Sequence, residues 1–201
     1  MYTIRAILLS KQSIRDNQIR IVLFTQEFGK ITAWAKKTFT ASDIWALTEI
    51  LVERKKQENI IHNVTPLFTP KNEWWNYRAT LQYLTLFHVM RESLPEWMEQ
   101  RWIFEDTKET IEYLSKIDYN NKVDNDKLVQ LFILMKARLL KKQWYLREEL
   151  FLKKDILPII YDRLDTASMK SMISSKNIHS GILDEIEFAV FEWIHTYKNR
   201  I

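Results

Sequence analysis

Apolar and polar positions alternate with a period of two through residues 1–70, which is the pattern of β-strands with one buried face. Gly29 lies between two of these alternating segments, where a hairpin requires a residue with positive φ. An insert near residues 41–47 has a helix-like or irregular pattern instead. The segments predicted as strands are residues 3–10, 19–25, 30–35, 49–54 and 59–65.

Beyond residue 70 the apolar period changes to that of amphipathic helices. The first predicted helix carries Tyr77 and Leu84 on one face, and it ends at Ser93-Leu94-Pro95 because proline cannot continue a helix. A short helix begins near Asp155, with Pro158 in its first turn. The remaining predicted helices are residues 103–114, 128–139 and 182–197.

These patterns predict an α+β protein with two domains. Five short strands and one insert favour a five-stranded Greek-key barrel of the OB-fold type at residues 1–70, and another small barrel fits the same spacing. Residues 71–201 then form an all-α helical domain.

The composition argues against most catalytic chemistry. The 201 residues include no cysteine and two glycines, which leaves no thiolate nucleophile, no thiolate zinc site and no glycine-rich phosphate loop. The four histidines are scattered without the spacing of metal ligands. We therefore expect a protein that is not an enzyme and that has no cofactor. Because the sequence has no apolar run of membrane-spanning length and no signal-peptide pattern, we expect a cytoplasmic protein without membrane contact.

Positive charge is concentrated in the predicted barrel. Residues 1–80 contain 12 Lys or Arg and 7 Asp or Glu, whereas residues 81–201 contain 18 and 19. A basic module beside a nearly neutral one favours a polyanionic partner for the basic module. A basic surface that serves only solubility is the alternative.

Residues 19–36 carry a resemblance to a known family. An apolar strand that ends in Leu23-Phe24-Thr25 is followed by Glu27-Phe28-Gly29-Lys30 and by a strand that runs into Ala35-Lys36. This order resembles the RecO family of recombination mediators, and the helical part is more loosely similar. The chain departs from the family where a glycine, an alanine and an arginine normally follow the lysine, since Lys37-Thr38-Phe39 stand there. It also lacks the four-cysteine zinc site of many members.

The resemblance implies a function as well as an OB-fold. It implies binding of single-stranded and double-stranded DNA, annealing of complementary strands, and help in loading RecA together with RecR. It further implies that the helical domain docks the C-terminal tail of single-strand-binding protein. The alternatives are a non-catalytic protein-interaction module and an RNA-binding OB-fold protein.

Proteins bind single strands with a basic groove along the phosphates and with aromatic faces that stack on bases. Lys30 and Lys36 lie within the motif that carries the resemblance, and Trp34 between them is a candidate for stacking. Each of these lysines has a solvated surface as its alternative, and Trp34 has the core. The predicted DNA-binding residues are Lys11, Arg15, Arg20, Lys30, Trp34, Lys36 and Lys37.

An acidic, apolar tail would dock in an apolar groove that is edged by basic side chains. The helix predicted over residues 128–139 and the chain just beyond it carry both kinds of residue. A solvated helix face is the alternative. The predicted partner-binding residues are Phe132, Leu139, Lys136, Lys141 and Lys142.

The tryptophan and glycine contents are both unusual. The chain has 2 glycines and 8 tryptophans, whereas glycine averages about 7% of protein sequences. Trp144 stands where the RecO family has glycine, and Trp45 is a second such candidate. One hypothesis is that a codon translated here as tryptophan is decoded as glycine in the source organism. A biased composition is the alternative.

Overall fold

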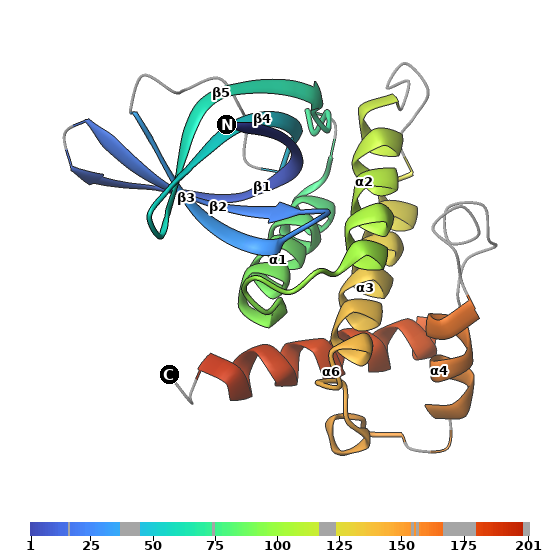
Figure 1. Ribbon diagram of the computed structural model, residues 1–201. Coiled ribbons are helices and arrows are strands. Elements are labelled where there is room, and N and C mark those ends of the chain that lie inside the picture. The colour runs from blue at the N-terminus through green and yellow to red at the C-terminus, as the bar shows by residue number, and fades with distance from the viewer. Residues whose placement is uncertain are drawn as a thin grey trace. The chain divides into compact units, whose positions relative to one another are not determined.

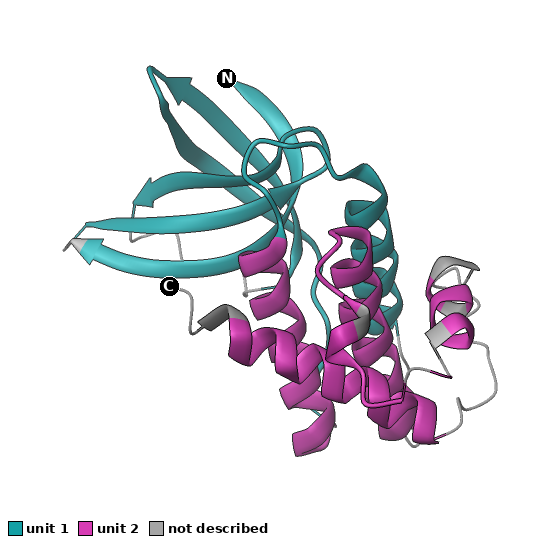
Figure 2. Cartoon of the chain, turned by 90° about the horizontal axis from the view of Figure 1, so that it is seen from below, with its two compact units in different colours: residues 1–73, 94–119 teal, residues 74–93, 120–201 magenta. Residues whose placement is uncertain are grey.

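The computed structural model describes residues 1–15, 17–36, 45–73, 75–116, 124–153, 155, 157–166 and 180–198. The chain divides into two compact units, each made from two separate stretches of sequence (Figure 2). Unit 1 comprises residues 1–73 and 94–119, and unit 2 comprises residues 74–93 and 120–201. The predicted insert at residues 41–47 lies mostly outside the described residues.

Unit 1 contains a closed barrel whose strands follow the order β1-β2-β3-β5-β4 (Figure 1). Neighbouring strands are antiparallel except β3 and β5, which run parallel where Trp34 pairs with Ile60. This is the Greek-key topology of the OB-fold, so the predicted fold class is confirmed. The strands are β1 (Tyr2–Arg15), β2 (Gln18–Thr25), β3 (Gly29–Lys36), β4 (Leu47–Lys55) and β5 (Glu58–Phe68).

The barrel interior is apolar because alternate residues of each strand point inward. On β3 the inward residues are Ile31, Ala33 and Ala35, and the residues between them face outward with partly exposed side chains. The inward residues of the five strands are Ile4, Ala6, Leu8, Ile19, Ile21, Leu23, Ile31, Ala33, Ala35, Ile50, Val52 and Ile61. The alternation seen in the sequence therefore decides which face of each strand is available to a ligand.

Gly29 is the point where the chain beyond the barrel approaches β3. Its φ is 65°, a left-handed conformation that glycine adopts without strain. The Trp97 amide donates a hydrogen bond to the Lys30 carbonyl over 3.0 Å, and Glu96 forms a parallel bridge with Lys30. A Cβ atom on Gly29 would overlap the carbonyl oxygen of Met98. Only a residue without a side chain permits this close approach.

Aromatic packing joins helix α2 (Arg101–Lys116) to the barrel within unit 1. Phe24 points out of the barrel, yet it is fully buried because its ring packs edge-on against Phe104 with centroids 5.6 Å apart. The Lys116 ammonium lies 5.4 Å from the centroid of the Phe68 ring. The described part of α2 is thus a component of the barrel unit.

Unit 2 consists of helices α1 (Tyr77–Ser93), α3 (Asn125–Lys142), α4 (Leu157–Thr166) and α6 (Ser180–Lys198), with the short 3-10 helix η1 (Glu148–Leu150). Helix α3 is central, since it packs against α1, α4 and α6. Trp75, Tyr83 and Phe132 form an aromatic cluster in the core of this unit. The helical content of this region agrees with the sequence pattern, but the predicted face of α1 does not: Tyr77 and Leu84 are exposed, and Tyr83 and Phe87 lie on the buried face.

Polar side chains set the start of two of these helices. The Asn76 side chain accepts a hydrogen bond from the Ala79 amide over 2.8 Å, and Asp124 accepts one from the Lys127 amide over 3.1 Å. Both are N-caps, which satisfy amide groups that a helix leaves unpaired at its first turn. None of the helices in the described ranges has both the length and the apolar character that a membrane span requires.

The variant Gly29→Ala tests the close approach at the start of β3. We expect the free energy of unfolding to fall by at least about 2 kcal/mol, because the new Cβ is strained at positive φ and overlaps Met98. Urea unfolding followed by circular dichroism measures this change. The control Gly181→Ala lies in helix α6, where alanine is the better helix former, so it should lose no stability. Equal losses in the two variants would contradict the role of Gly29.

Candidate nucleic-acid interface

Strands β1, β2 and β3 are basic in composition. These three strands contain six Lys or Arg residues and no Asp or Glu. The basic residues are Arg5, Lys11, Arg15, Arg20, Lys30 and Lys36. Except for Arg5, all were predicted as DNA contacts.

The strand register brings several of these residues together. Arg20 on β2 lies directly between Gln12 on β1 and Trp34 on β3. Two residues further along, Gln18 lies between Arg15 and Lys36. Because residues two apart on a strand share a face, the two rows form one patch on the outside of the barrel. We call it the β1–β3 patch.

Arg20 and Lys36 are exposed in this patch, and Trp34 is half-buried beside them. Arg20 is diagonal to Lys36 across the β2–β3 pair, a relation that spans about 7–8 Å between backbones and is within reach of long side chains. The patch therefore presents two cations around one aromatic ring. That combination suits a nucleic-acid strand, whose phosphates are anionic and whose bases stack on aromatic rings.

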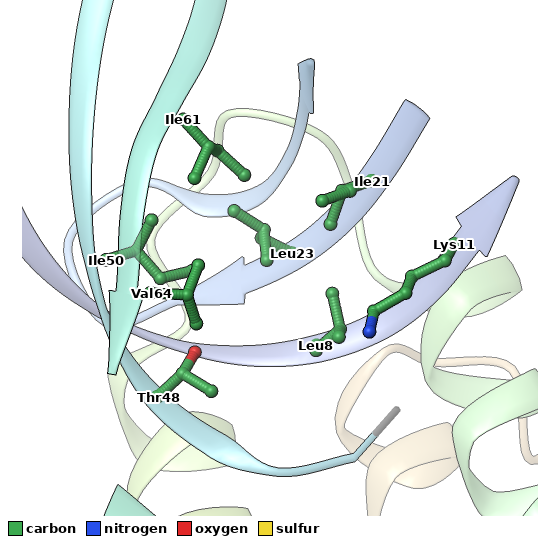
Figure 3. Close-up of a pocket in the computed structure, with 8 residues that line it drawn as sticks. All are labelled: Leu8, Lys11, Ile21, Leu23, Thr48, Ile50, Ile61 and Val64. Atoms are coloured by element: carbon green, nitrogen blue, oxygen red, sulfur yellow. The ribbon is translucent and has the colours of Figure 1, made fainter. Parts of the chain in front are cut away.

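Lys11 does not share the outer face with Arg20. The register of β1 against β2 shifts between Leu8 and Ser10, and this irregularity places Lys11 opposite the inward residue Ile21. Lys11 accordingly lines a small apolar cavity at the barrel interior, together with Leu8 and Leu23 (Figure 3). The space is about that of one water molecule, so it does not accommodate a base.

The other predicted DNA contacts have different positions. Lys30 is half-buried, and its carbonyl holds the Trp97 amide as described above. Arg15 is the last residue of β1 and pairs with Gln18 on β2. Lys37 lies outside the described residues.

Strands β4 and β5 have the opposite charge balance, with Glu49, Glu53 and Glu58 against Arg54 and Lys55. A ring nitrogen of His62 lies 2.8 Å from the Glu53 carboxylate, and the Lys55 ammonium lies 3.4 Å from it. The hydrogen bond from His62 lowers the pKa of Glu53 below its ordinary value, so this carboxylate stays ionised. The outside of the barrel is therefore basic on one set of strands and more acidic on the other.

The predicted partner-binding residues of the helical unit are largely internal. Phe132, Leu139 and Lys136 are all less than 5% exposed. Lys141 is half-buried, with its ammonium 3.0 Å from the Tyr161 carbonyl and 4.5 Å from the centroid of the Tyr161 ring. Of the five, Lys142 alone is exposed. These residues do not form the exposed groove with a basic rim that the sequence suggested, because three of them face the helices packed around α3.

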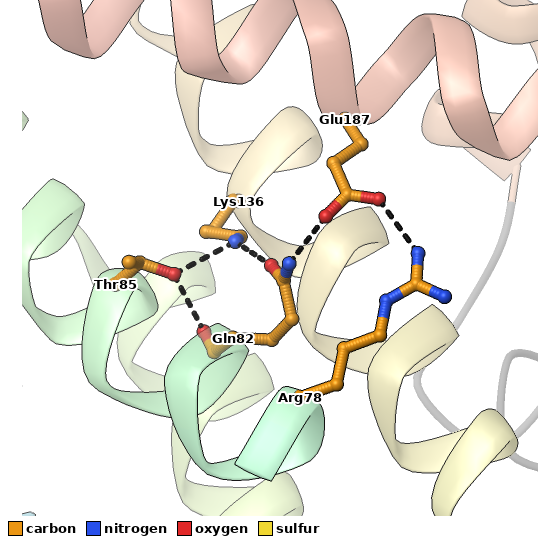
Figure 4. Close-up of polar contacts among 5 residues, drawn as sticks. All are labelled: Arg78, Gln82, Thr85, Lys136 and Glu187. Atoms are coloured by element: carbon orange, nitrogen blue, oxygen red, sulfur yellow. Dashed lines mark hydrogen bonds and ion pairs between the residues drawn. The ribbon is translucent and has the colours of Figure 1, made fainter.

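Lys136 is the buried cation of a polar network in unit 2 (Figure 4). Its ammonium donates hydrogen bonds to the Gln82 side-chain oxygen and to Thr85 Oγ1, the latter over 2.9 Å. The Gln82 side-chain nitrogen donates to the Glu187 carboxylate, and the Arg78 guanidinium donates to the same carboxylate over 2.9 Å. The network joins helices α1, α3 and α6.

Burial lowers the pKa of Lys136 from its ordinary value of 10.5 to about 8, and the Glu187 carboxylate opposes that shift. The shift is a structural consequence of bringing a lysine into a helical core with neutral hydrogen-bond partners.

Comparisons with known proteins identify no family: no family model matches the chain, and a search of curated proteins found no match. Among the described residues, no group of three or more His, Cys, Asp or Glu side chains is placed to hold a metal ion.

Sequence reasoning missed two features of the β1–β3 patch. The amide side chains of Gln12 and Gln18 lie in the same rows as the cations, and they were not singled out because strand register is not visible in the sequence. The charge difference between β1–β3 and β4–β5 was also missed. A count of charges strand by strand, instead of over residues 1–80, would have found it.

The Lys136 pKa predicts how stability depends on pH. Between pH 8 and 10.5 the unfolded chain keeps the lysine proton and the folded chain loses it, so the free energy of unfolding rises with pH. We expect the lost proton of Lys136 to raise the free energy of unfolding by about 3 kcal/mol across this pH range.

Urea unfolding of the unaltered protein and of Lys136→Met at pH values across this range isolates the contribution, because the variant lacks it. The control Lys142→Met removes an exposed lysine from the same helix and should keep the pH dependence. A difference between the unaltered protein and Lys136→Met that does not change with pH would show that Lys136 keeps its ordinary pKa.

Proposed function

We propose that the protein binds single-stranded nucleic acid on the β1–β3 patch of its OB-fold barrel. The observation that carries this proposal is the arrangement of Arg20 and Lys36 around Trp34 on a face whose strands contain no acidic residue. The opposite balance on β4 and β5 supports the same choice of face, because carboxylates such as Glu49 and Glu53 repel phosphates.

The geometry supports a mode of binding with little sequence preference. A base stacks on the ring of Trp34, and neighbouring phosphates contact Arg20 and Lys36. The side-chain amides of Gln12 and Gln18 add hydrogen bonds to sugar or phosphate oxygens in the same rows. Since most of the contacts are to phosphates, binding releases counterions and weakens as salt increases.

The finer proposal is a recombination mediator of the RecO type. It rests on the resemblance of residues 19–36, which form strands β2 and β3 and the turn between them. On this proposal the protein binds single-stranded and double-stranded DNA, anneals complementary strands, and acts with RecR to help RecA load onto DNA. Annealing needs no catalytic group, since cations that screen phosphate repulsion bring two strands together. We assign no residues to RecR or to the tail of single-strand-binding protein.

The experiment for nucleic-acid binding compares two variants that each remove two positive charges. Arg20→Gln/Lys36→Gln alters the patch, and Lys55→Gln/Lys56→Gln alters the end of β4 and the turn that follows it. Fluorescence anisotropy of a labelled poly-dT oligomer, titrated at several salt concentrations, measures the affinity. We expect the patch variant to reduce the slope of log K against log salt by about 1.4, since a single strand contributes about 0.7 per phosphate contact.

The control variant should keep the slope of the unaltered protein, because its net charge matches that of the patch variant while the patch is intact. Equal slopes for the two double variants would place binding elsewhere on the chain. No binding by the unaltered protein at low salt would reject the proposal, and the protein-interaction module would replace it. Competition between DNA and RNA oligomers of one sequence distinguishes a DNA-binding from an RNA-binding protein.

The mediator proposal predicts faster annealing. We expect the unaltered protein to accelerate the pairing of two complementary DNA strands carrying donor and acceptor dyes, and we expect the patch variant to accelerate it less. The Lys55→Gln/Lys56→Gln variant serves again as the control. Tight binding to both strands without any acceleration would separate DNA binding from the mediator role and reject the latter.

A further inference from the structure

The backbone assigns an unusual conformation to three tryptophans. Among the described residues other than glycine, four have positive φ, and three of these are Trp45 (74°), Trp97 (58°) and Trp144 (61°). The fourth is Lys56 (56°), in the hairpin turn between β4 and β5. We propose that positions 45, 97 and 144 are glycine in the protein made by the source cells, where one codon translated here as tryptophan is decoded as glycine.

The steric argument is general. A side chain with a Cβ atom is disfavoured at positive φ, and a bulky residue there is a genuine outlier, whereas glycine adopts the conformation freely. Tryptophan is 8 of the 201 residues, yet it supplies three of the four positions. Asparagine and aspartate, the residues that tolerate this region best after glycine, supply none of the four.

Position 144 has the hydrogen bonds of a motif that usually requires glycine. Helix α3 ends at Lys142, and Gln143 is its C-cap. The Trp144 amide donates to the Lys141 carbonyl, and the Tyr145 amide donates to the Leu140 carbonyl, each over 2.9 Å. These two bonds define the Schellman motif, in which the residue after the C-cap is left-handed and is most often glycine.

The exposure of the side chain at position 144 is a second reason to infer glycine there. Trp144 is 87% exposed, so almost none of its apolar surface is buried. Neither the backbone nor the ring thus gains from tryptophan at this position.

Position 97 lies in the segment that approaches Gly29. Its amide bonds to the Lys30 carbonyl, and the next residue, Met98, has the carbonyl oxygen that excludes a Cβ atom from Gly29. Two left-handed residues therefore face each other where the backbones meet. Trp97 is 47% exposed, and the Arg54 guanidinium lies 5.2 Å from the centroid of its ring.

Position 45 lies two residues before Leu47, the first residue of β4. Its amide donates to the Leu8 carbonyl over 2.7 Å, and the Leu8 amide donates to the Ala46 carbonyl over 3.3 Å. The left-handed conformation at position 45 lets both backbone hydrogen bonds to Leu8 form. At this position, as at 97 and 144, the hydrogen bonds involve backbone atoms and need no tryptophan side chain.

The remaining described tryptophans set a contrast, because none of them has positive φ. Trp75 and Trp193 are less than 10% exposed, and their rings pack against Tyr83 and Tyr145, with centroids 4.9 and 5.7 Å apart. Trp34 lies in a regular strand. The inference therefore concerns three positions and leaves Trp34 in the β1–β3 patch. It is independent of the proposed function, but it removes the exposed rings of Trp97 and Trp144 as candidate anchors for a base or a partner.

The direct test is peptide mass spectrometry of the protein purified from the source cells, read beside the gene. We expect peptides with glycine at positions 45, 97 and 144, all three encoded by UGA, and tryptophan at positions 75 and 193, encoded by UGG. Tryptophan at position 97 or 144 in the native peptides would overturn the inference. Codons at the three positions that are the same as those at positions 75 and 193 would also overturn it.

Variants of the protein with the printed sequence test the same inference through stability. We expect Trp144→Gly and Trp97→Gly each to raise the melting temperature by about 2–4 °C, because each relieves the strain of a left-handed residue with a side chain. Trp193→Gly should lower it, since a packed ring is lost.

Trp144→Ala separates relief of backbone strain from removal of an exposed ring. We expect Trp144→Ala to raise the melting temperature less than Trp144→Gly, because alanine keeps the Cβ atom. A Trp144→Ala variant as stable as Trp144→Gly would count against glycine as the native residue.

Discussion

The close approach of residues 96–98 to the start of β3 is the constraint on which the barrel unit depends. The Lys30 carbonyl receives an amide from this segment, and the missing side chain of Gly29 leaves room for the Met98 carbonyl. With the segment held there, helix α2 follows directly, and its Phe104 covers Phe24, an outward-facing residue that would otherwise expose a large apolar ring. One glycine thus permits a helix distant in sequence to complete the packing of the barrel.

The same barrel imposes order on the charges at its surface. Inward positions are filled by aliphatic side chains, so every charged residue of β2 and β3 must face outward. Pairing then sets Arg20 beside Trp34 and Lys36 beside Gln18. The shift in β1 has the opposite effect on Lys11, which it turns toward the interior and away from the patch. A candidate interface therefore follows from pairing geometry as much as from the number of basic residues.

In the helical unit, by contrast, a charged side chain is buried in the core. Lys136 is surrounded by α1 and α6, and it remains in the core because Gln82 and Thr85 supply acceptors and Glu187 supplies a negative charge nearby. Such a network specifies how three helices meet, since a shift of α3 or α6 relative to α1 breaks hydrogen bonds to Gln82. It also explains why a basic residue at this position does not serve as a binding rim.

The sequence by itself determined the elements of the fold: five strands from the alternation of period two, the helices from the longer period, and the hairpin at Gly29. It also placed the basic excess in residues 1–80. Tertiary structure alone decided that α2 belongs to the barrel unit, that Lys11 turns inward and that Lys136 is buried. The reason is physical. Periodicity reports on neighbours in the chain, whereas strand register, barrel closure and burial depend on contacts between residues that are far apart in it.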